Sequence, residues 1–125
     1  LWDASGPPAY DETHGVVRFT DHGIEVLPDR FNALGGGALR RARETGANLI
    51  LMDECGRFEE QAVVFQSELF AALERDTPVL GVVRQGFHGW LDAIRSHPKV
   101  ILLAVTEDNR DTLPGQIVGL LRGEC

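Results

Sequence analysis

The sequence predicts an α/β fold with three layers, in which helices flank a mostly parallel sheet. Three short apolar runs, at residues 48–52, 78–83 and 99–105, are typical of strands buried on both faces. The segments between them repeat apolar residues at intervals of three and four, as helices with one face on a core do. Such alternation requires parallel strands joined by right-handed crossovers.

Size and charge limit the classes of protein to consider. At 125 residues the chain is long enough for one domain, so residues 1–125 are treated as a single domain. Its 12 basic and 19 acidic residues give a net charge of -7, which would repel a phosphate backbone, so we expect no nucleic-acid partner. No apolar run approaches the roughly 20 residues that span a bilayer, so we expect no membrane partner.

The cysteines and the first residue give two further expectations. Cys55 and Cys125 form neither a disulfide framework nor a metal-binding pair, which favours a reducing, cytoplasmic setting. The chain starts at Leu1 and not at Met, without a signal segment, so we expect its start to be an edge of a longer chain.

The first third of the chain predicts a hairpin and a helix. Residues 1–15 are rich in turn formers and are expected to be irregular, whereas β-prone runs at 16–19 and 24–27 predict an antiparallel hairpin. Apolar residues from Phe31 onward predict a helix that ends at Gly46. Glycines 35–37 interrupt it, and since each glycine costs about 1 kcal/mol relative to alanine, we expect a firm helix only over residues 38–45.

Three further helices are predicted from their apolar faces. The first presents Ala62, Phe65, Leu69, Ala72 and Leu73 and is bounded by Asp76 and Pro78. The second is short, ends before Pro98 and contains Trp90, Leu91 and Ile94. The last tolerates Pro114 in its first turn and presents Leu113, Ile117, Leu120 and Leu121.

The first apolar run ends in a group of charged residues. Residues 53–59 read Asp-Glu-Cys-Gly-Arg-Phe-Glu, at the strand end where open parallel sheets bind ligands. Two adjacent acids there are costly to bury unless a cation or a donor satisfies them. They predict a magnesium-phosphate centre, in which one acid directs Mg²⁺ and the other positions or deprotonates a water. The alternative is that Asp53 and Glu54 begin a turn and cap the next helix.

Residues 53–59 resemble the Asp-Glu-(apolar)-Gly-Lys-(apolar)-Glu motif of the small THEP-type nucleoside triphosphatases, a family of the P-loop superfamily. Residues 105–111, Val-Thr-Glu-Asp-Asn-Arg-Asp, resemble the family's Val-Thr-x-Glu-Asn-Arg-Asp segment, and residues 78–81 resemble its next strand. The resemblance spans roughly residues 16–121. It implies a P-loop fold, Mg²⁺ as cofactor, an ATP- or GTP-type nucleotide as partner, and hydrolysis of that triphosphate to the diphosphate and phosphate.

The resemblance also implies roles for four of residues 53–59. Asp53 is the Walker B ligand of magnesium, and Glu54 is the catalytic residue that activates water. Arg57 replaces the family's lysine near the phosphates, where its planar guanidinium can contact phosphate oxygens in pairs. Glu59 orients Arg57 or belongs to the outer magnesium shell.

A second pair of candidates, Asn109 and Arg110, follows the third apolar run. By the resemblance they frame the nucleotide base. The alternative is that they cap the start of the last helix together with Asp111, and the residues leave both interpretations open.

The sequence departs from the family where the phosphates bind. The Gly-x-x-x-x-Gly-Lys-Ser/Thr loop is absent, and glycines 35–37 with Arg40 and Arg41 lack its Lys-Ser/Thr pair. Val82 stands where the family has threonine. The family's first strand is absent too, and we expect its place between the strand that carries Asp53 and the strand after it.

These departures leave two function classes open. Residues not shown, self-association or a complementing chain would have to supply the missing strand. A rival to hydrolysis is a non-catalytic nucleotide-binding, regulatory or assembly module that has lost the phosphate loop. Other candidates are weak: the four histidines share no metal-ligand spacing, and carboxylates beside Cys55 raise a thiol's pKa.

Overall fold

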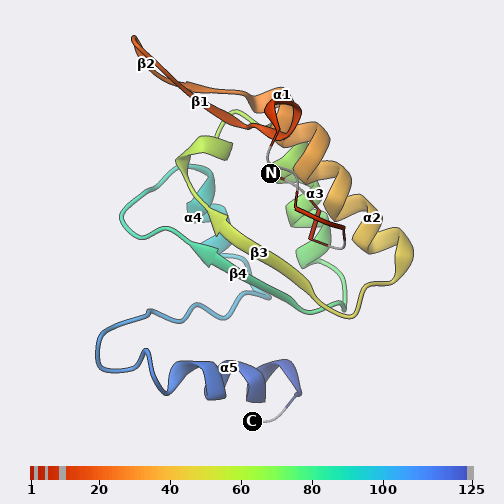
Figure 1. Cartoon of the computed structure of the whole chain (residues 1–125). Helices are drawn as coiled ribbons and strands as arrows, with labels where there is room; N and C mark the ends of the chain where they lie inside the picture. The colour runs from red at the N-terminus through yellow and green to blue at the C-terminus, as the bar shows by residue number, and fades with distance from the viewer. Residues whose placement is uncertain (2, 5, 9–10, 124–125) are drawn as a thin grey trace.

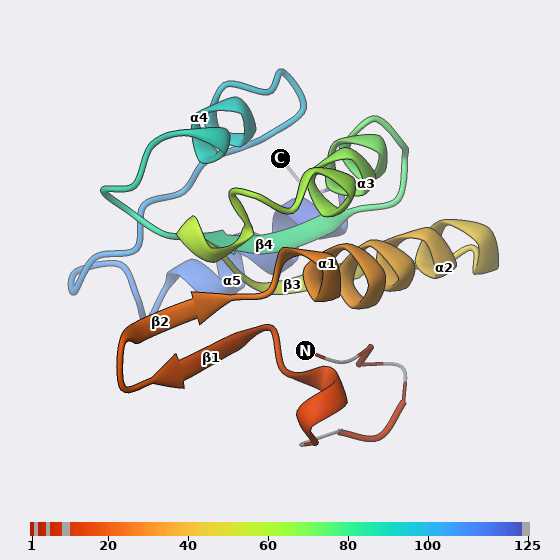
Figure 2. The same cartoon turned by 90° about the horizontal axis from the view of Figure 1, so that it is seen from above.

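The computed structural model describes residues 1, 3–4, 6–8 and 11–123. Its centre is a parallel pair of strands, β3 (Ile50–Cys55) and β4 (Val79–Val83), joined by helix α3 (Val63–Leu73) (Figures 1 and 2). The α/β prediction is therefore confirmed. Two residues named from the sequence lie outside the described residues: Trp2, which is expected to anchor the core or an interface, and Cys125.

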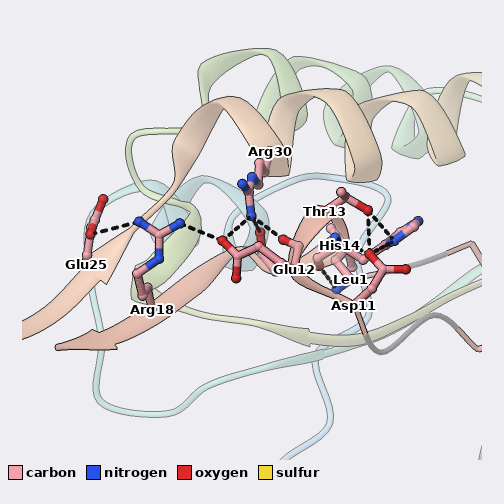
Figure 3. Close-up of polar contacts among 9 residues, drawn as sticks. Leu1, Asp11, Glu12, Thr13, His14, Arg18, Glu25 and Arg30 are labelled. Carbon is pink, nitrogen blue, oxygen red and sulfur yellow. Dashed lines mark hydrogen bonds and ion pairs between the residues drawn. The ribbon is translucent and has the colours of Figure 1, made fainter.

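The predicted hairpin is present, displaced by one residue. Strands β1 (Val17–Thr20) and β2 (Gly23–Val26) pair antiparallel. Charged side chains link it to its surroundings (Figure 3): the Glu12 carboxylate lies 2.6 Å from Arg18 Nη2 and 3.5 Å from Arg30 Nη1. Arg30 belongs to the short helix α1 (Pro28–Arg30), so Glu12 connects the hairpin to the start of the helical region.

The glycine-rich helix is continuous, so the expectation of a helix firm only over residues 38–45 is wrong. Helix α1 leads into a π-helical segment, Phe31–Gly36, and then into α2 (Gly37–Thr45), which ends at Gly46 with φ of 69°. Gly35 is buried, and a Cβ placed on it would lie 2.7 Å from Cδ2 of Phe65 on α3. The glycine is needed because it lets an aromatic ring pack directly on the helix backbone, a contact that local propensity does not include.

Helices α3 and α4 (Trp90–Arg95) bury their predicted faces, whereas on the predicted face of α5 (Leu113–Leu121) Leu113 is buried and Leu120 is exposed. Helix α4 ends before Pro98, and α5 has proline in its first turn. Most of the buried core lies on helices. Ile50 and Cys55 come from β3, and Ala62 directly precedes α3; the helical members are Phe31, Leu39, Phe65, Leu69, Ala72, Leu91 and Ile94. None of the helices in the described ranges combines the length and hydropathy needed to cross a bilayer.

Two expectations about the sheet are wrong. Strands β3 and β4 are direct neighbours, with Ile50 opposite Val79 and Met52 opposite Gly81, so no missing strand lies between them. Residues 99–105 do not form the predicted third strand. A strand requires an edge to pair with, and no strand in the described part of the chain lies next to this segment.

The close contact at Gly35 gives a test of the core. We expect Gly35→Ala to destabilise the fold by about 1–3 kcal/mol, because the added methyl group overlaps the Phe65 ring. Gly37→Ala is the matched control: its nearest neighbour is the mobile end of Arg41, at 3.3 Å, so it should be neutral or stabilise by about 0.5–1 kcal/mol. Urea denaturation of both variants measures the difference, and equal midpoints would contradict the packing argument.

Candidate functional site

The acid pair lies in a bulge of β3. Met52 is opposite Gly81 and Cys55 is opposite Val83, so two residues of β3, Asp53 and Glu54, face the single Val82 of β4. A regular strand would turn two consecutive side chains to opposite faces. The bulge changes their direction, as bulges beside binding sites often do, and leaves both carboxylates exposed at the carboxyl end of the strand pair.

Both carboxylates are available for a ligand. No described residue forms a hydrogen bond or ion pair with the side chain of Asp53. Glu54 lies 3.8 Å from Nη1 of Arg84, the residue that follows β4, and the two side chains are 57% and 64% exposed. Pairs this open and this distant contribute about 0–1 kcal/mol. The acids are therefore not held in permanent salt bridges within the chain.

Glu59 stabilises the turn that follows the acid pair. Its buried carboxylate accepts a hydrogen bond from the backbone N–H of Gly56 at 3.0 Å, and burial raises the pKa of this carboxyl group. The Trp90 indole N–H donates to the Gly56 carbonyl at 2.9 Å, and its ring packs edge-on against Phe65. Trp90 thus packs on the core and connects α4 to the turn that follows the acid pair.

Arg57 is exposed in the same turn, a 3-10 helix over Arg57–Glu59. Its guanidinium carbon lies 5.2 Å from the centre of the Phe58 ring, within the range of a cation–π contact. Glu59 is bonded to the backbone of Gly56 and has no ion pair with Arg57 in the described structure. The Arg57 side chain therefore remains accessible to an anionic ligand.

Asn109 fixes the loop between residues 105 and 113. Its Oδ1 accepts from the Thr106 N–H at 2.7 Å, and its Nδ2 donates to the Ala104 carbonyl at 2.8 Å. These bonds favour the structural role for Asn109 over contact with a base. The side chain of the adjacent Arg110 is exposed, and Figure 1 shows this loop on the same side of the molecule as the carboxyl ends of β3 and β4.

Cys55 is enclosed behind the acids. Burial, and then the charges of Glu59 and Glu54, raise the pKa of its thiol from the ordinary 9.0 to about 12. A thiol of this kind is neutral at physiological pH and is a poor nucleophile. The cysteine therefore contributes packing to this site and no covalent chemistry.

The structure brings Asp53, Glu54 and Arg84 together, with Arg57 in the adjoining turn. Arg84 was not identified from the sequence, although its position directly after a parallel strand is a usable signal. Among the described residues, no three His, Cys, Asp or Glu side chains gather closely enough to hold a metal ion. His88 and His97 instead pair with Asp92 and Glu74.

Comparisons with known proteins agree on one family. A family model described as NTPase matches residues 9–118. The nucleoside-triphosphatase THEP1 of Methanosarcina barkeri is 39% identical over 90 residues, which cover 71% of this chain and 49% of that protein. THEP1 of Thermofilum pendens is 35% identical over 94 residues, which cover 74% and 51%. The chain thus spans about half the length of the curated relatives it matches.

A solved structure supports the fold. The crystal structure of THEP1 from the hyperthermophile Aquifex aeolicus aligns with a TM-score of 0.66 and 23% identity, covering 87% of this chain and 67% of that one. At this identity the likeness concerns the arrangement of helices and strands.

The enclosed thiol gives a test of the site's packing. In a Cys125→Ser background, we expect a disulfide reagent at pH 8 to modify native Cys55 on the order of 10²–10³-fold more slowly than in denaturant. The reason is the small thiolate fraction that a pKa of about 12 allows, together with burial. Similar rates with and without denaturant would show that Cys55 is open to solvent.

Proposed function

Because the chain belongs to the family of THEP-type nucleoside triphosphatases, we propose that the protein hydrolyses a nucleoside triphosphate to the diphosphate and phosphate. The observation that carries the proposal is the bulge of β3, which presents two adjacent, exposed carboxylates at the ligand-binding edge of a parallel strand pair. Capping, the alternative use of such acids, has no support at Asp53 or Glu54, since neither accepts a bond from a helix N-terminus in the described structure.

The acid pair fits Mg²⁺. Magnesium retains several waters and takes one or two carboxylates together with phosphate oxygens, so it does not need a cage of three protein ligands. We assign Asp53 as its ligand, since this carboxylate has no partner among the described residues. When bound, the ion would neutralise charge on the phosphates.

Glu54 is proposed as the residue that orients and deprotonates the attacking water. A general base must be within hydrogen-bonding reach of the water and must remain ionised. Glu54 is exposed at the same edge as Asp53, and its distant contact with Arg84 leaves its oxygens free to accept a bond.

Four further residues complete the proposed site. Arg57 is assigned to phosphate oxygens, with Glu59 acting through the turn that it holds and not through direct contact. Arg110 is assigned to the base of the nucleotide, and Asn109 acts by fixing the loop that presents it. The choice between ATP-type and GTP-type nucleotides and the cytoplasmic location stay predictions from the sequence.

Replacing the proposed base tests the mechanism. In the full-length natural polypeptide, Glu54→Gln should lower turnover by about 10²–10⁴-fold and leave nucleotide affinity largely unchanged, because the amide keeps the shape of the side chain but cannot take a proton. Phosphate release under saturating nucleotide and Mg²⁺ measures turnover. Glu60→Gln is the control, a nearby exposed carboxylate outside the proposed machinery; equal turnover of the Glu54 variant and the parent would refute the assignment.

Asp53→Asn tests the metal assignment separately. We expect it to raise the Mg²⁺ concentration needed for half-maximal hydrolysis by about tenfold or more, because a charged ligand is lost while the water-activating residue remains.

Calorimetric titration of the full-length polypeptide with nucleotide and Mg²⁺ distinguishes hydrolysis from the rival, non-catalytic function. Binding with no hydrolysis would favour a non-catalytic nucleotide-binding module, and absence of binding would favour a regulatory or assembly module that has lost the phosphate loop.

A further inference from the structure

Arg84, the residue that follows β4, has a fixed backbone. Its N–H donates to the Cys55 carbonyl at 3.0 Å, and its carbonyl accepts from Nη2 of Arg95 at 2.7 Å. Nη1 of Arg95 in turn donates to Oδ1 of Asp92 at 2.9 Å, and only 22% of the Arg95 side chain is exposed. The main chain of Arg84 is therefore bonded to β3 on one side and to α4 on the other.

The guanidinium of Arg84 takes no part in these bonds. It forms no hydrogen bond with a described residue, and its ion pair is the 3.8 Å contact with Oε1 of Glu54. The side chain is 64% exposed. An arginine whose backbone is fixed thus presents a free charged group to the edge where the acid pair lies.

The charges at this edge call for a cation beside the acid pair. A nucleoside triphosphate brings negative charge to a site that already holds Asp53 and Glu54, and like charges repel at short range. In the transition state, negative charge is spread over three oxygens of the phosphoryl group that is transferred. Among the described residues, Arg84 is the cation paired with one of the two acids, whereas Arg57 lies in the turn that follows.

Arg84 is close enough to reach the γ-phosphate. If Glu54 holds the attacking water, that water lies about 2.6–3.2 Å from its carboxylate, and the phosphorus lies about 3–3.5 Å from the water. The guanidinium lies 3.8 Å from the same carboxylate. Rotation about its exposed side-chain bonds can therefore bring it onto the phosphate oxygens while the backbone stays in place.

We propose that Arg84 is a further catalytic residue of the proposed hydrolysis, on which this inference rests. Its guanidinium leaves Glu54 and donates hydrogen bonds to oxygens of the γ-phosphate in the transition state. The water oxygen forms a bond to the γ-phosphorus while the bond from that phosphorus to the β–γ bridging oxygen breaks. The water proton passes to Glu54, and the electron pair of the broken bond stays on the diphosphate. Arg84 exchanges no proton and acts by neutralising charge.

Arg84→Ala tests the assignment in the full-length natural polypeptide. It should lower kcat by about 10²–10³-fold, as the loss of one donor to a developing anion does. The affinity for the nucleoside diphosphate should change by less than about threefold, because the contact is made in the transition state. Arg84→Lys keeps the charge but loses the paired donors, so it should recover only part of the rate.

Arg75→Ala is the matched control, since Arg75 is exposed and precedes the amino end of β4. It should leave kcat unchanged. The Tm of Arg84→Ala should equal that of the parent, because the backbone bonds of residue 84 remain. Phosphate release under saturating nucleotide and Mg²⁺ measures kcat, and full turnover of Arg84→Ala would overturn the proposal.

A second measurement distinguishes contact with phosphate from an effect through Glu54. The probe is ADP or GDP, matched to the triphosphate that the parent hydrolyses, with aluminium fluoride and Mg²⁺; this complex resembles the phosphoryl group during transfer. In a Glu54→Gln background, Arg84→Ala should still weaken calorimetric binding of the probe by about tenfold or more. No further loss in that background would show that Arg84 acts only through Glu54, and the proposal would be wrong.

Failure of this inference can be told apart from failure of the hydrolysis. A parent polypeptide that releases no phosphate would refute the hydrolysis and the role of Arg84 together. A parent that hydrolyses nucleotide, with an equally active Arg84→Ala variant, would refute the role of Arg84 alone and leave the assignments of Asp53 and Glu54 in place.

Discussion

The parallel pairing of β3 with β4 is the constraint on which the rest of the structure depends. It fixes the position of the bulge, because the register that starts at Ile50 and Val79 is shifted before Cys55. It also determines which backbone groups of β4 bond to β3 and which point to its other edge, where the described residues contain no strand. The exposed acids and the unpaired edge are therefore consequences of the same set of hydrogen bonds.

In residues 53–59, the backbone conformation places similar acidic side chains in different environments. Asp53 and Glu54 lie in the bulge and stay in water, where ionised carboxylates are stable. Glu59 lies only five residues further on, yet it is buried and bonded to Gly56, and its pKa is raised by that burial. Two carboxylates are thus free for a ligand, while the third holds the turn that follows them.

The sequence predicts those features that depend on residues close together along the chain. The hairpin, the faces of α3, α4 and α5, and the delivery of the acids to the end of an apolar strand all follow from periodicity and from breaker residues. The sequence does not predict a continuous helix through glycines 35–37, because the contact that favours it is with the ring of Phe65, about thirty residues away. The sequence does not predict the bulge either, because a bulge is a property of two paired strands and no local pattern marks where their register shifts.

The failure of residues 99–105 to form a strand separates two properties that usually occur together. The apolar, β-branched composition is a property of the segment itself and indicates burial. A strand also needs backbone hydrogen bonds, which only a neighbouring strand can provide. The same reasoning applies to the candidate site. Its acidic half is set by β3 and β4 alone, whereas groups that hold phosphates are backbone N–H groups and cations placed by other elements. The acidic half of the site is therefore local to this strand pair.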